Sequence, residues 1–213
     1  MINKKGLLLV VSGPSGTGKG TICKDIVAKH EDINLSISAT TRKPRVGEVE
    51  GKSYFFKTKE DFEDMVDKGE FLEHAMIYDN YYGTPKKAIF DELDMGRDVI
   101  LEIEMQGAMQ IKEVYPQAVF IFVLPPSLQE LKNRIIGRGT ETEEQIEKRF
   151  NSAYDEIKLL GDYDYFIFNN IVEKSSEEIL NILEVEKNKV KRYKKDILDM
   201  FEKEIKNVKT IIK

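Results

Sequence analysis

Residues 7–21, LLLVVSGPSGTGKGT, combine a short apolar run with glycines and a lysine at a spacing that can hold a polyphosphate. Glycines let the backbone turn its N–H groups inward with no Cβ in the way. Those donors and the positive end of a following helix bind phosphate oxygens, and Lys19 adds a point charge. The spacing Gly13-xxxx-Gly18-Lys19 is typical of a phosphate-binding loop (P-loop) between a strand and a helix. The residues of this expected cradle are Gly13, Pro14, Ser15, Gly16, Thr17, Gly18, Lys19, Gly20 and Thr21.

One position of this loop departs from the strict pattern. A Ser or Thr normally follows the lysine and offers its hydroxyl to Mg²⁺. Here Gly20 stands in that place and Thr21 comes next, so the hydroxyl is missing or displaced by one residue. We therefore assign no direct protein ligand to a metal, and expect Mg²⁺ to be held mainly by nucleotide phosphates and water.

The composition indicates one compact α/β domain with small insertions. The 213 residues are 41% hydrophobic and 33% charged, with a net charge of −5, which lacks the basic excess of a nucleic-acid binder. Cys23 is the only cysteine, so an internal disulfide and a cysteine zinc cluster are excluded. The apolar run near the N-terminus is too short for a signal peptide, and none approaches a membrane span. We expect a cytoplasmic protein that binds neither membranes nor nucleic acid.

Apolar runs and helical patterns alternate along the chain, which predicts a parallel sheet with helices on both faces. Ligands of such sheets lie at the carboxyl ends of the strands, where the P-loop, Glu102 and Asn169 fall. Buried strands are expected at residues 7–11, 98–103, 118–124 and 164–168, and helices at 18–29, 86–93, 128–136 and 141–160.

Residues 38–88 are expected to form a small mixed insert. A short strand at 35–39 leads to Thr-Thr-Arg-Lys-Pro-Arg, where Pro44 enforces an extended loop on which Arg42 and Arg45 can converge on one anion. The remaining expected elements are a strand at 53–56, a helix at 59–68, an extended segment at 70–78 and a tight connection at 80–84.

The second half of the chain carries arginines near a glycine hinge and ends in an amphipathic tail. Gly137-Arg138-Gly139 between two helices that carry Arg134 and Arg149 is typical of a closing lid. Ser175 and Glu178 have the spacing of a capping box, which predicts one long helical tract from Ser175 onward. Its stripe of apolar residues could pack on the chain's own core or on a second subunit. The stripe consists of Val190, Tyr193, Ile197, Phe201, Ile205, Val208 and Ile212.

Seven segments in order together resemble the guanylate kinase family over about residues 6–185. They are SGPSGTGKGT (12–21), SATTRKPRVGEVEGKSYFF (38–56), FLEHA (71–75), NYYGTP (80–85), ILEIEMQGA (100–108), FVLPPS (122–127) and GRGTETEEQIEKR (137–149). The resemblance implies transfer of the γ-phosphoryl group of ATP to GMP, and to dGMP, giving ADP and GDP or dGDP. It also implies an α/β P-loop fold with a three-layer parallel-sheet core. The core would be residues 1–37, 89–125 and 160–213, the GMP-binding insert 38–88 and the helical lid 126–159.

The resemblance also implies a role for each candidate residue. The P-loop would bind ATP with Mg²⁺, and the catalytic residues would be Lys19, Arg42, Arg134, Arg138 and Arg149. Glu73 would accept hydrogen bonds from the guanine N1–H and amine, which adenine cannot provide in the same way. Glu104 stands where relatives commonly have aspartate, so the carboxylate that would face the guanine amine is one methylene farther from the backbone and keeps its charge. The GMP-binding set would be Ser38, Arg42, Arg45, Tyr54, Glu73, Tyr82, Thr84, Glu102 and Glu104.

Three other functions fit part of the pattern. A related protein-binding module without activity would not need Lys19 and the full set of arginines. A kinase of a ribose phosphate would not need Glu73 with the hydroxyls of Ser38 and Thr84. An adenylate-type kinase would carry different lid and base-site motifs. The sequence leaves open whether the chain is a monomer or a homodimer.

Overall fold

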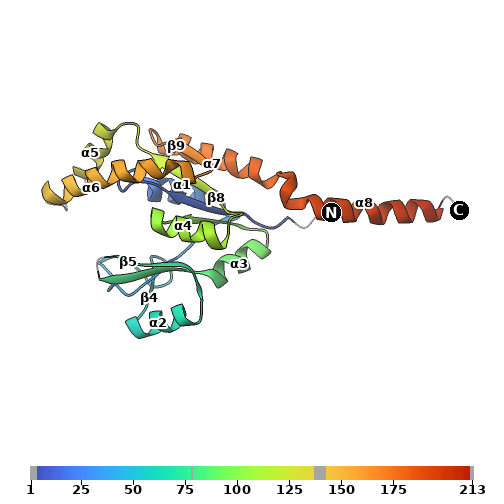
Figure 1. Ribbon diagram of the computed structural model, residues 1–213, viewed down its shortest axis with the longest axis horizontal. Helices are drawn as coiled ribbons and strands as arrows, with labels where there is room; N and C mark the ends of the chain where they lie inside the picture. The colour runs from blue at the N-terminus through green and yellow to red at the C-terminus, as the bar shows by residue number, and fades with distance from the viewer. Residues whose placement is uncertain (1–3, 78, 137–142, 212–213) are drawn as a thin grey trace.

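The structure, a computed structural model, describes residues 4–77, 79–136 and 143–211, with side chains omitted at 143–149 and 208–211. Two sheets form its framework (Figure 1). The larger is a five-stranded sheet of order β2-β7-β1-β8-β9 whose neighbouring strands all pair in parallel. The smaller has four strands in the order β4-β3-β6-β5. The prediction of an α/β protein with a parallel core sheet is confirmed.

The larger sheet is made from the apolar runs of the sequence. Its strands are β1 (Leu8–Ser12), β2 (Ile33–Leu35), β7 (Asp98–Glu102), β8 (Val119–Leu124) and β9 (Tyr165–Phe168). Every residue of β1 and β8 is buried, because helices cover both faces of the sheet.

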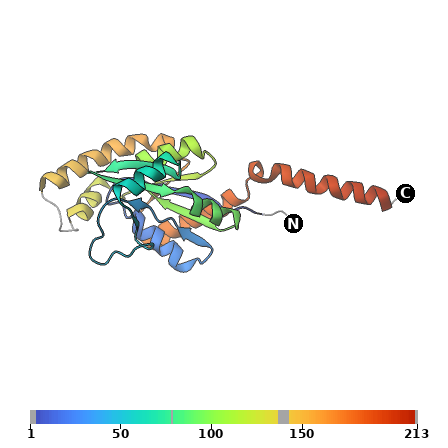
Figure 2. The ribbon, with the colours of Figure 1, turned by 90° about the horizontal axis from the view of Figure 1, so that it is seen from below.

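The alternation of side chains along β1 divides the core into two layers. Leu9 and Val11 pack with residues of α1 (Lys19–Lys29) and α7 (Val172–Lys187) on one face. Leu8 and Val10 pack with α3 (Lys86–Asp94) and α4 (Met105–Val114) on the other. Figure 2 shows the ribbon of the sheet and its helices from below. Between β8 and β9 the chain forms α5 (Leu128–Ile136), α6 (Glu143–Ile157) and the 3₁₀ helix η1 (Lys158–Asp162).

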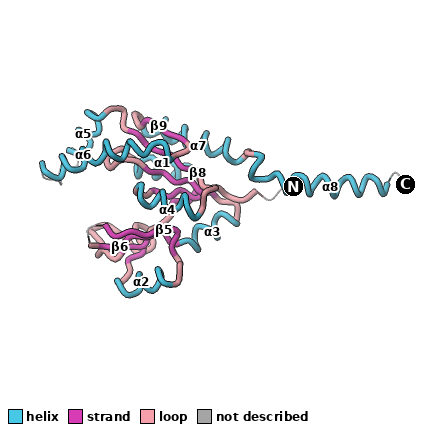
Figure 3. Tube along the Cα trace, viewed as in Figure 1, coloured by secondary structure: helices cyan, strands magenta, loops and turns pink. Residues whose placement is uncertain are grey.

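The smaller sheet and one helix form the insert (Figure 3). Its elements are β3 (Ala39–Thr40), β4 (Phe55–Phe56), α2 (Lys59–Asp67), β5 (Phe71–Ile77) and β6 (Asn80–Pro85). Thr58 caps α2 by accepting a hydrogen bond from the Asp61 N–H at 3.0 Å. Phe62 of α2 stacks on Phe71 at 4.5 Å between ring centroids, so the insert has a small core of its own.

Two predictions about the insert are wrong. The single strand expected at 35–39 is two short strands in different sheets, because the chain leaves the core sheet after Leu35 and joins the insert at Ala39. The tight connection expected at 80–84 is the strand β6, which pairs with β3 on one side and β5 on the other. Gly83 suggested a turn, but a Cβ there would lie 2.8 Å from the Phe71 ring, so the glycine permits close packing.

Two predictions about the C-terminal half are also wrong. Ser175 is not an N-cap: α7 begins at Val172, and the buried Ser175 hydroxyl donates to Asn169 Oδ1 at 3.2 Å. The single helical tract is two helices, α7 and α8 (Val190–Ile211). Similarly, the helix expected over 141–160 is α6 followed by η1 within the described residues. Among the described helices, none is both long and apolar enough to cross a bilayer.

A buried ion pair fastens α7 to the core sheet and gives a stability prediction. The Asp98 carboxylate, 1% exposed, accepts from the Leu7 N–H at 2.7 Å and from Lys187 Nζ at 2.8 Å. Lys187→Ala leaves this carboxylate without its cation and is expected to cost about 2–3 kcal/mol of unfolding free energy. Urea denaturation measures it as a lower midpoint at an unchanged slope. The control Lys59→Ala, which breaks an exposed pair, should cost about 0.5 kcal/mol or less. If both variants lost the same unfolding free energy, burial would not be the reason for the contribution of the Asp98–Lys187 pair.

Candidate active site

The P-loop follows β1 and leads directly into α1. Gly13 and Gly18 adopt positive φ values of 135° and 89°, and Gly18 is the N-cap of α1. A Cβ on Gly13 would lie 2.4 Å from the Val123 carbonyl oxygen, so the chain could not pass β8 at this point with a larger residue. The loop therefore has the backbone geometry that the sequence predicts, with its amides beside the positive end of α1.

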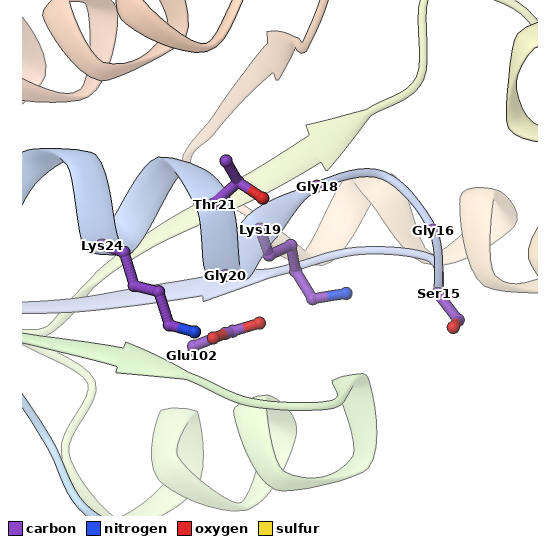
Figure 4. A pocket seen from close by; sticks show the side chains of 8 residues that line it. All are labelled: Ser15, Gly16, Gly18, Lys19, Gly20, Thr21, Lys24 and Glu102. Carbon is purple, nitrogen blue, oxygen red and sulfur yellow. The ribbon is translucent and has the colours of Figure 1, made fainter. Parts of the chain in front are cut away.

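Lys19 lies at the centre of a cavity of about 390 Å³ between the loop and the end of β7 (Figure 4). Its ammonium group donates to the carbonyl oxygens of Gly13 and Pro14 at 2.5 and 3.1 Å. Burial lowers the pKa of Lys19, while the charges of Glu102, Glu156 and Glu104 oppose this shift. Because burial disfavours an unpaired ammonium group, an anionic ligand in the cavity would stabilise the charged form of Lys19. The cavity is lined by Ser15, Gly16, Gly18, Lys19, Gly20, Thr21, Lys24 and Glu102.

Glu102 belongs to this cavity, and Gly20 gives it room. A Cβ on Gly20 would lie 3.0 Å from both carboxylate oxygens of Glu102, which accounts for glycine where P-loops usually carry Ser or Thr. Lys24, four residues after Gly20 on the same face of α1, lies beside the Glu102 carboxylate (Figure 4). The sequence analysis did not predict Lys24 as a site residue. Its spacing of four residues from Gly20 could have indicated that it lies on the same face of the helix as the P-loop glycine.

A carboxylate facing a phosphate cradle is a suitable oxygen donor for Mg²⁺ or its water shell. Among the described residues, no three His, Cys, Asp or Glu side chains cluster as metal ligands.

Two side chains from later in the chain form hydrogen bonds with the backbone of the P-loop. Asn169, just after β9, donates from Nδ2 to the Thr17 carbonyl at 2.7 Å. Arg134 of α5 donates to the Asn169 carbonyl at 3.0 Å and to the Thr17 carbonyl at 3.4 Å. Glu130 accepts from Arg134 Nε at 3.0 Å and orients the guanidinium. The structure thus places Arg134 against the cradle.

In the insert, Arg42, Tyr54 and Tyr82 come together. The Arg42 guanidinium lies 5.4 Å from the centre of the Tyr54 ring, whose centroid is 6.1 Å from that of Tyr82. The hydrogen bonds that the Arg42 guanidinium makes with Glu48 and Tyr82 raise the pKa of Arg42. Glu48, which was not predicted, accepts from Arg42 at 2.8 Å and from the Arg45 N–H at 2.8 Å, and so orders the loop. The side chain of Arg45 is exposed.

Glu73 of β5 is a buried carboxylate that faces β6. Thr84, its cross-strand partner, donates its hydroxyl to Glu73 Oε1 at 2.6 Å. Burial raises the pKa of Glu73, the Thr84 hydrogen bond lowers it, and the charge of Glu104 raises it. Glu104, the N-cap residue of α4, therefore lies within electrostatic reach of Glu73, whereas Glu102 lies with the P-loop. A buried acceptor beside a hydroxyl suits a ligand with adjacent N–H donors.

Two residues of α4 that were not predicted position Glu73. A Cβ on Gly107 would lie 2.8 Å from Glu73 Oε2, so glycine is needed for the carboxylate to fit. Gln110 accepts from the His74 N–H at 3.3 Å and donates to the His74 carbonyl at 3.2 Å, which ties β5 to the core beside Glu73. The amphipathic pattern of a helix at 105–114 was the only sequence signal for these contacts.

The other predicted residues are placed as follows. Ser38 is half-buried where the chain enters the insert. Arg138 lies outside the described residues, and Arg149 falls within α6 but its side chain is not among those described. Glu156 of α6, which was not predicted, is half-buried and electrostatically coupled to Lys19 and Glu104.

The Thr84 hydroxyl should influence the pH below which Glu73 becomes protonated and ligand binding is lost. Removing it in Thr84→Val takes away a hydrogen bond that stabilises the carboxylate, so the raised pKa of Glu73 should rise further. If Glu73 must be ionised to bind its ligand, the acid limb of the pH profile of ligand affinity should move to higher pH. The control Ser176→Ala removes a hydroxyl of α7 that donates to the Val172 carbonyl at 3.0 Å and should leave the limb in place. A limb that does not move in Thr84→Val would contradict the assignment.

The chain matches the family model described as guanylate kinase over residues 5–186. A guanylate kinase of Clostridioides difficile is 67% identical over 96% of this chain and all of its own length. One of Caldanaerobacter subterraneus is 55% identical over 91% of this chain and 94% of its own. The crystal structure of guanylate kinase from Anaplasma phagocytophilum superposes with a TM-score of 0.72 at 36% identity, over 89% of this chain and 90% of that one. The chain therefore belongs to the guanylate kinase family, the enzymes that transfer a phosphoryl group from ATP to GMP.

Proposed function

We propose that ATP binds at the P-loop with its γ-phosphate directed toward the insert, and that GMP binds in the insert with its guanine on Glu73. The observation that supports this most is the pairing of a buried, hydroxyl-bonded Glu73 in the insert with a lysine-centred phosphate cradle in the core. The acceptor phosphate is already an anionic nucleophile, so no general base is needed. Catalysis is then positioning and neutralisation of charge.

On the ATP side, Lys19 and the loop amides would hold the β- and γ-phosphates. Lys19 would exchange the carbonyls of Gly13 and Pro14 for phosphate oxygens, which removes the mismatch of a buried cation bonded to neutral groups. Arg134, with Arg138 and Arg149 of the proposed lid, would neutralise the transferring group. Glu102, which lines the cavity, is the carboxylate that would hold Mg²⁺ through water, and the ion that accompanies ATP would supply positive charge to the phosphates.

On the GMP side, the Arg42, Tyr54 and Tyr82 cluster would bind the acceptor phosphate together with Arg45. Guanidinium groups suit phosphate because two parallel N–H donors match two oxygens. Arg42 forms an ion pair with Glu48 in this structure, so binding of GMP would replace Glu48 with the phosphate as the anionic partner of Arg42. Ser38, Thr84 and Glu104 would complete the guanine site around Glu73. We propose residues 38–88 as this GMP-binding part, 126–159 as the lid and the rest as the core of a cytoplasmic enzyme.

The substitution Arg42→Ala should weaken the binding of GMP and leave that of ATP nearly unchanged. It removes a charge-assisted, bidentate contact with the acceptor phosphate, which is worth about 2–4 kcal/mol. We expect the dissociation constant of GMP to rise by about 30-fold or more, while that of ATP changes little. Titration calorimetry with each nucleotide measures both constants, and Lys43→Ala, an exposed neighbour, is the matched control. Weaker ATP binding with unchanged GMP binding would reverse the assignment of the two sites.

The function itself is tested by ADP release from the purified chain with ATP and one acceptor at a time. GMP, and to a lesser extent dGMP, should support release, while AMP and ribose 5-phosphate should not. Release with ribose phosphate alone would favour the sugar-phosphate kinase, and the absence of release with every acceptor would favour the protein-binding module.

A further inference from the structure

The Glu102 carboxylate lies across the place where a P-loop usually carries a hydroxyl side chain. A Cβ on Gly20 would lie 3.0 Å from Oε1, 3.0 Å from Oε2 and 3.3 Å from the carboxylate carbon of Glu102. Both oxygens are thus equally close to the first side-chain atom that any other residue would have at position 20. A serine or threonine at this position would have to share that space with the carboxylate.

Glu102 reaches this place from the strand next to the P-loop strand. It is the last residue of β7, which pairs in parallel with β1, and it is level with Val11, two residues before Gly13. In P-loop enzymes that hydrolyse nucleotides, Mg²⁺ is held by the Ser or Thr of the loop and by an aspartate. This chain has Gly20 in the first place, and its carboxylate belongs to a glutamate, which is longer by one carbon–carbon bond of about 1.5 Å. The added length carries the carboxylate toward the space that the glycine leaves.

The hydroxyl of Thr21, the next residue along the chain, does not take this place. Consecutive residues of an α-helix are turned by about 100°, so Thr21 leaves α1 in a different direction from that in which Gly20 faces Glu102. Figure 4 shows the Thr21 hydroxyl apart from the Glu102 side chain, which lies between Lys19 and Lys24. Among the described residues that line the cavity, Glu102 is the one carboxylate.

We propose that the Glu102 carboxylate takes over the role of the missing P-loop hydroxyl toward Mg²⁺, and that Gly20 and Glu102 form an exchangeable pair. This inference rests on the proposed ATP site at the P-loop. A larger residue at position 20 displaces the carboxylate, and a shorter carboxylate at position 102 leaves the space without an oxygen. The combination Gly20→Ser/Glu102→Asp places a hydroxyl in the space that the shorter carboxylate leaves, so it supplies an oxygen there again.

Calorimetric titration with ATP, without an acceptor, in excess Mg²⁺ and in excess EDTA tests this pair. Because the coupling of two ligands is reciprocal, the ratio of the two ATP dissociation constants reports how much the protein strengthens the hold on the metal. The wild type should bind ATP about tenfold more tightly in Mg²⁺, and Gly20→Ala and Glu102→Asp should each lower this ratio about fivefold or more. Affinity in EDTA should change less than about twofold, because neither substitution changes the charge of the cradle. Gly161→Ala, where a Cβ meets nothing within 4 Å, is the matched control and should keep the wild-type ratio.

Two double variants separate the oxygen from the filling of space. Gly20→Ser/Glu102→Asp should restore the ratio to within about threefold of wild type, whereas Gly20→Ala/Glu102→Asp, which fills the space without an oxygen, should not. The inference is overturned if ATP binds the wild type equally tightly in both buffers, if either single variant keeps the wild-type ratio, or if the two double variants behave alike. A chain that binds ATP in neither buffer would contradict the proposed ATP site itself, and this inference with it.

Discussion

Lys19→Met should lower kcat by about 10³-fold or more while leaving the fold unchanged. The methionine has nearly the length of lysine and fills its place between the loop and β7, but it carries no charge to the outer phosphates. A preorganised cation that stabilises developing charge is worth about 4 kcal/mol in a site shielded from water. Within the part of the chain that the structure describes, the Lys19 ammonium group bonds to loop carbonyls and to no carboxylate, so no structural ion pair is lost there.

Steady-state kinetics with saturating ATP and GMP measure this effect, and thermal unfolding checks the fold. Lys29→Met, on the exposed last turn of the same helix, is the matched control and should keep nearly full activity. Turnover close to that of the wild type in Lys19→Met would contradict the P-loop assignment.

Glu73→Gln should reduce the preference for GMP over AMP in kcat/KM by about 10²-fold or more. The carboxylate can accept from both the guanine N1–H and the amine, and its charge strengthens both bonds. Glutamine accepts only one of them and turns an NH₂ toward the other donor, which costs GMP about 2–4 kcal/mol. AMP loses little, because its N1 is an acceptor that the amide can meet.

The loss should be confined to the acceptor, since the P-loop and Arg42 are untouched. KM for ATP should therefore stay near its wild-type value. Glu70→Gln, an exposed residue just before the same strand, is the matched control. An unchanged ratio in Glu73→Gln would show that Glu73 does not read the base, and Glu104, its electrostatic neighbour, would be the next residue to replace.

The P-loop was predictable from sequence because its geometry is local. The glycines, Lys19 and the apolar strand before them are adjacent in the chain, and each has a backbone or charge requirement that its residue type reveals. The extended loop that carries Arg42 and Arg45 was predictable for a similar reason, since Pro44 lies within it; that both arginines bind one anion stays a prediction. The parallel core followed from apolar runs alternating with helical patterns.

The contacts that place Glu73 could not be read from the sequence because they join distant segments. Gly107 and Gln110 lie more than 30 residues from Glu73, and neither has a local motif that points to β5. Glu48 resembles any charged residue of a surface turn until its ion pair with Arg42 is seen. Strand β6 was mistaken for a turn because Gly83 serves packing against Phe71, a reason that only the tertiary structure supplies.

The claim that this chain moves the γ-phosphoryl group of ATP onto GMP is tested most directly by following that group. The purified chain is incubated with Mg²⁺, GMP and ATP labelled at the γ-phosphate, and the products are separated. The account predicts label in the β-phosphate of GDP, in amounts equal to the ADP formed, and little label in ADP when AMP replaces GMP. Label recovered as inorganic phosphate, or transferred equally to AMP, would contradict it.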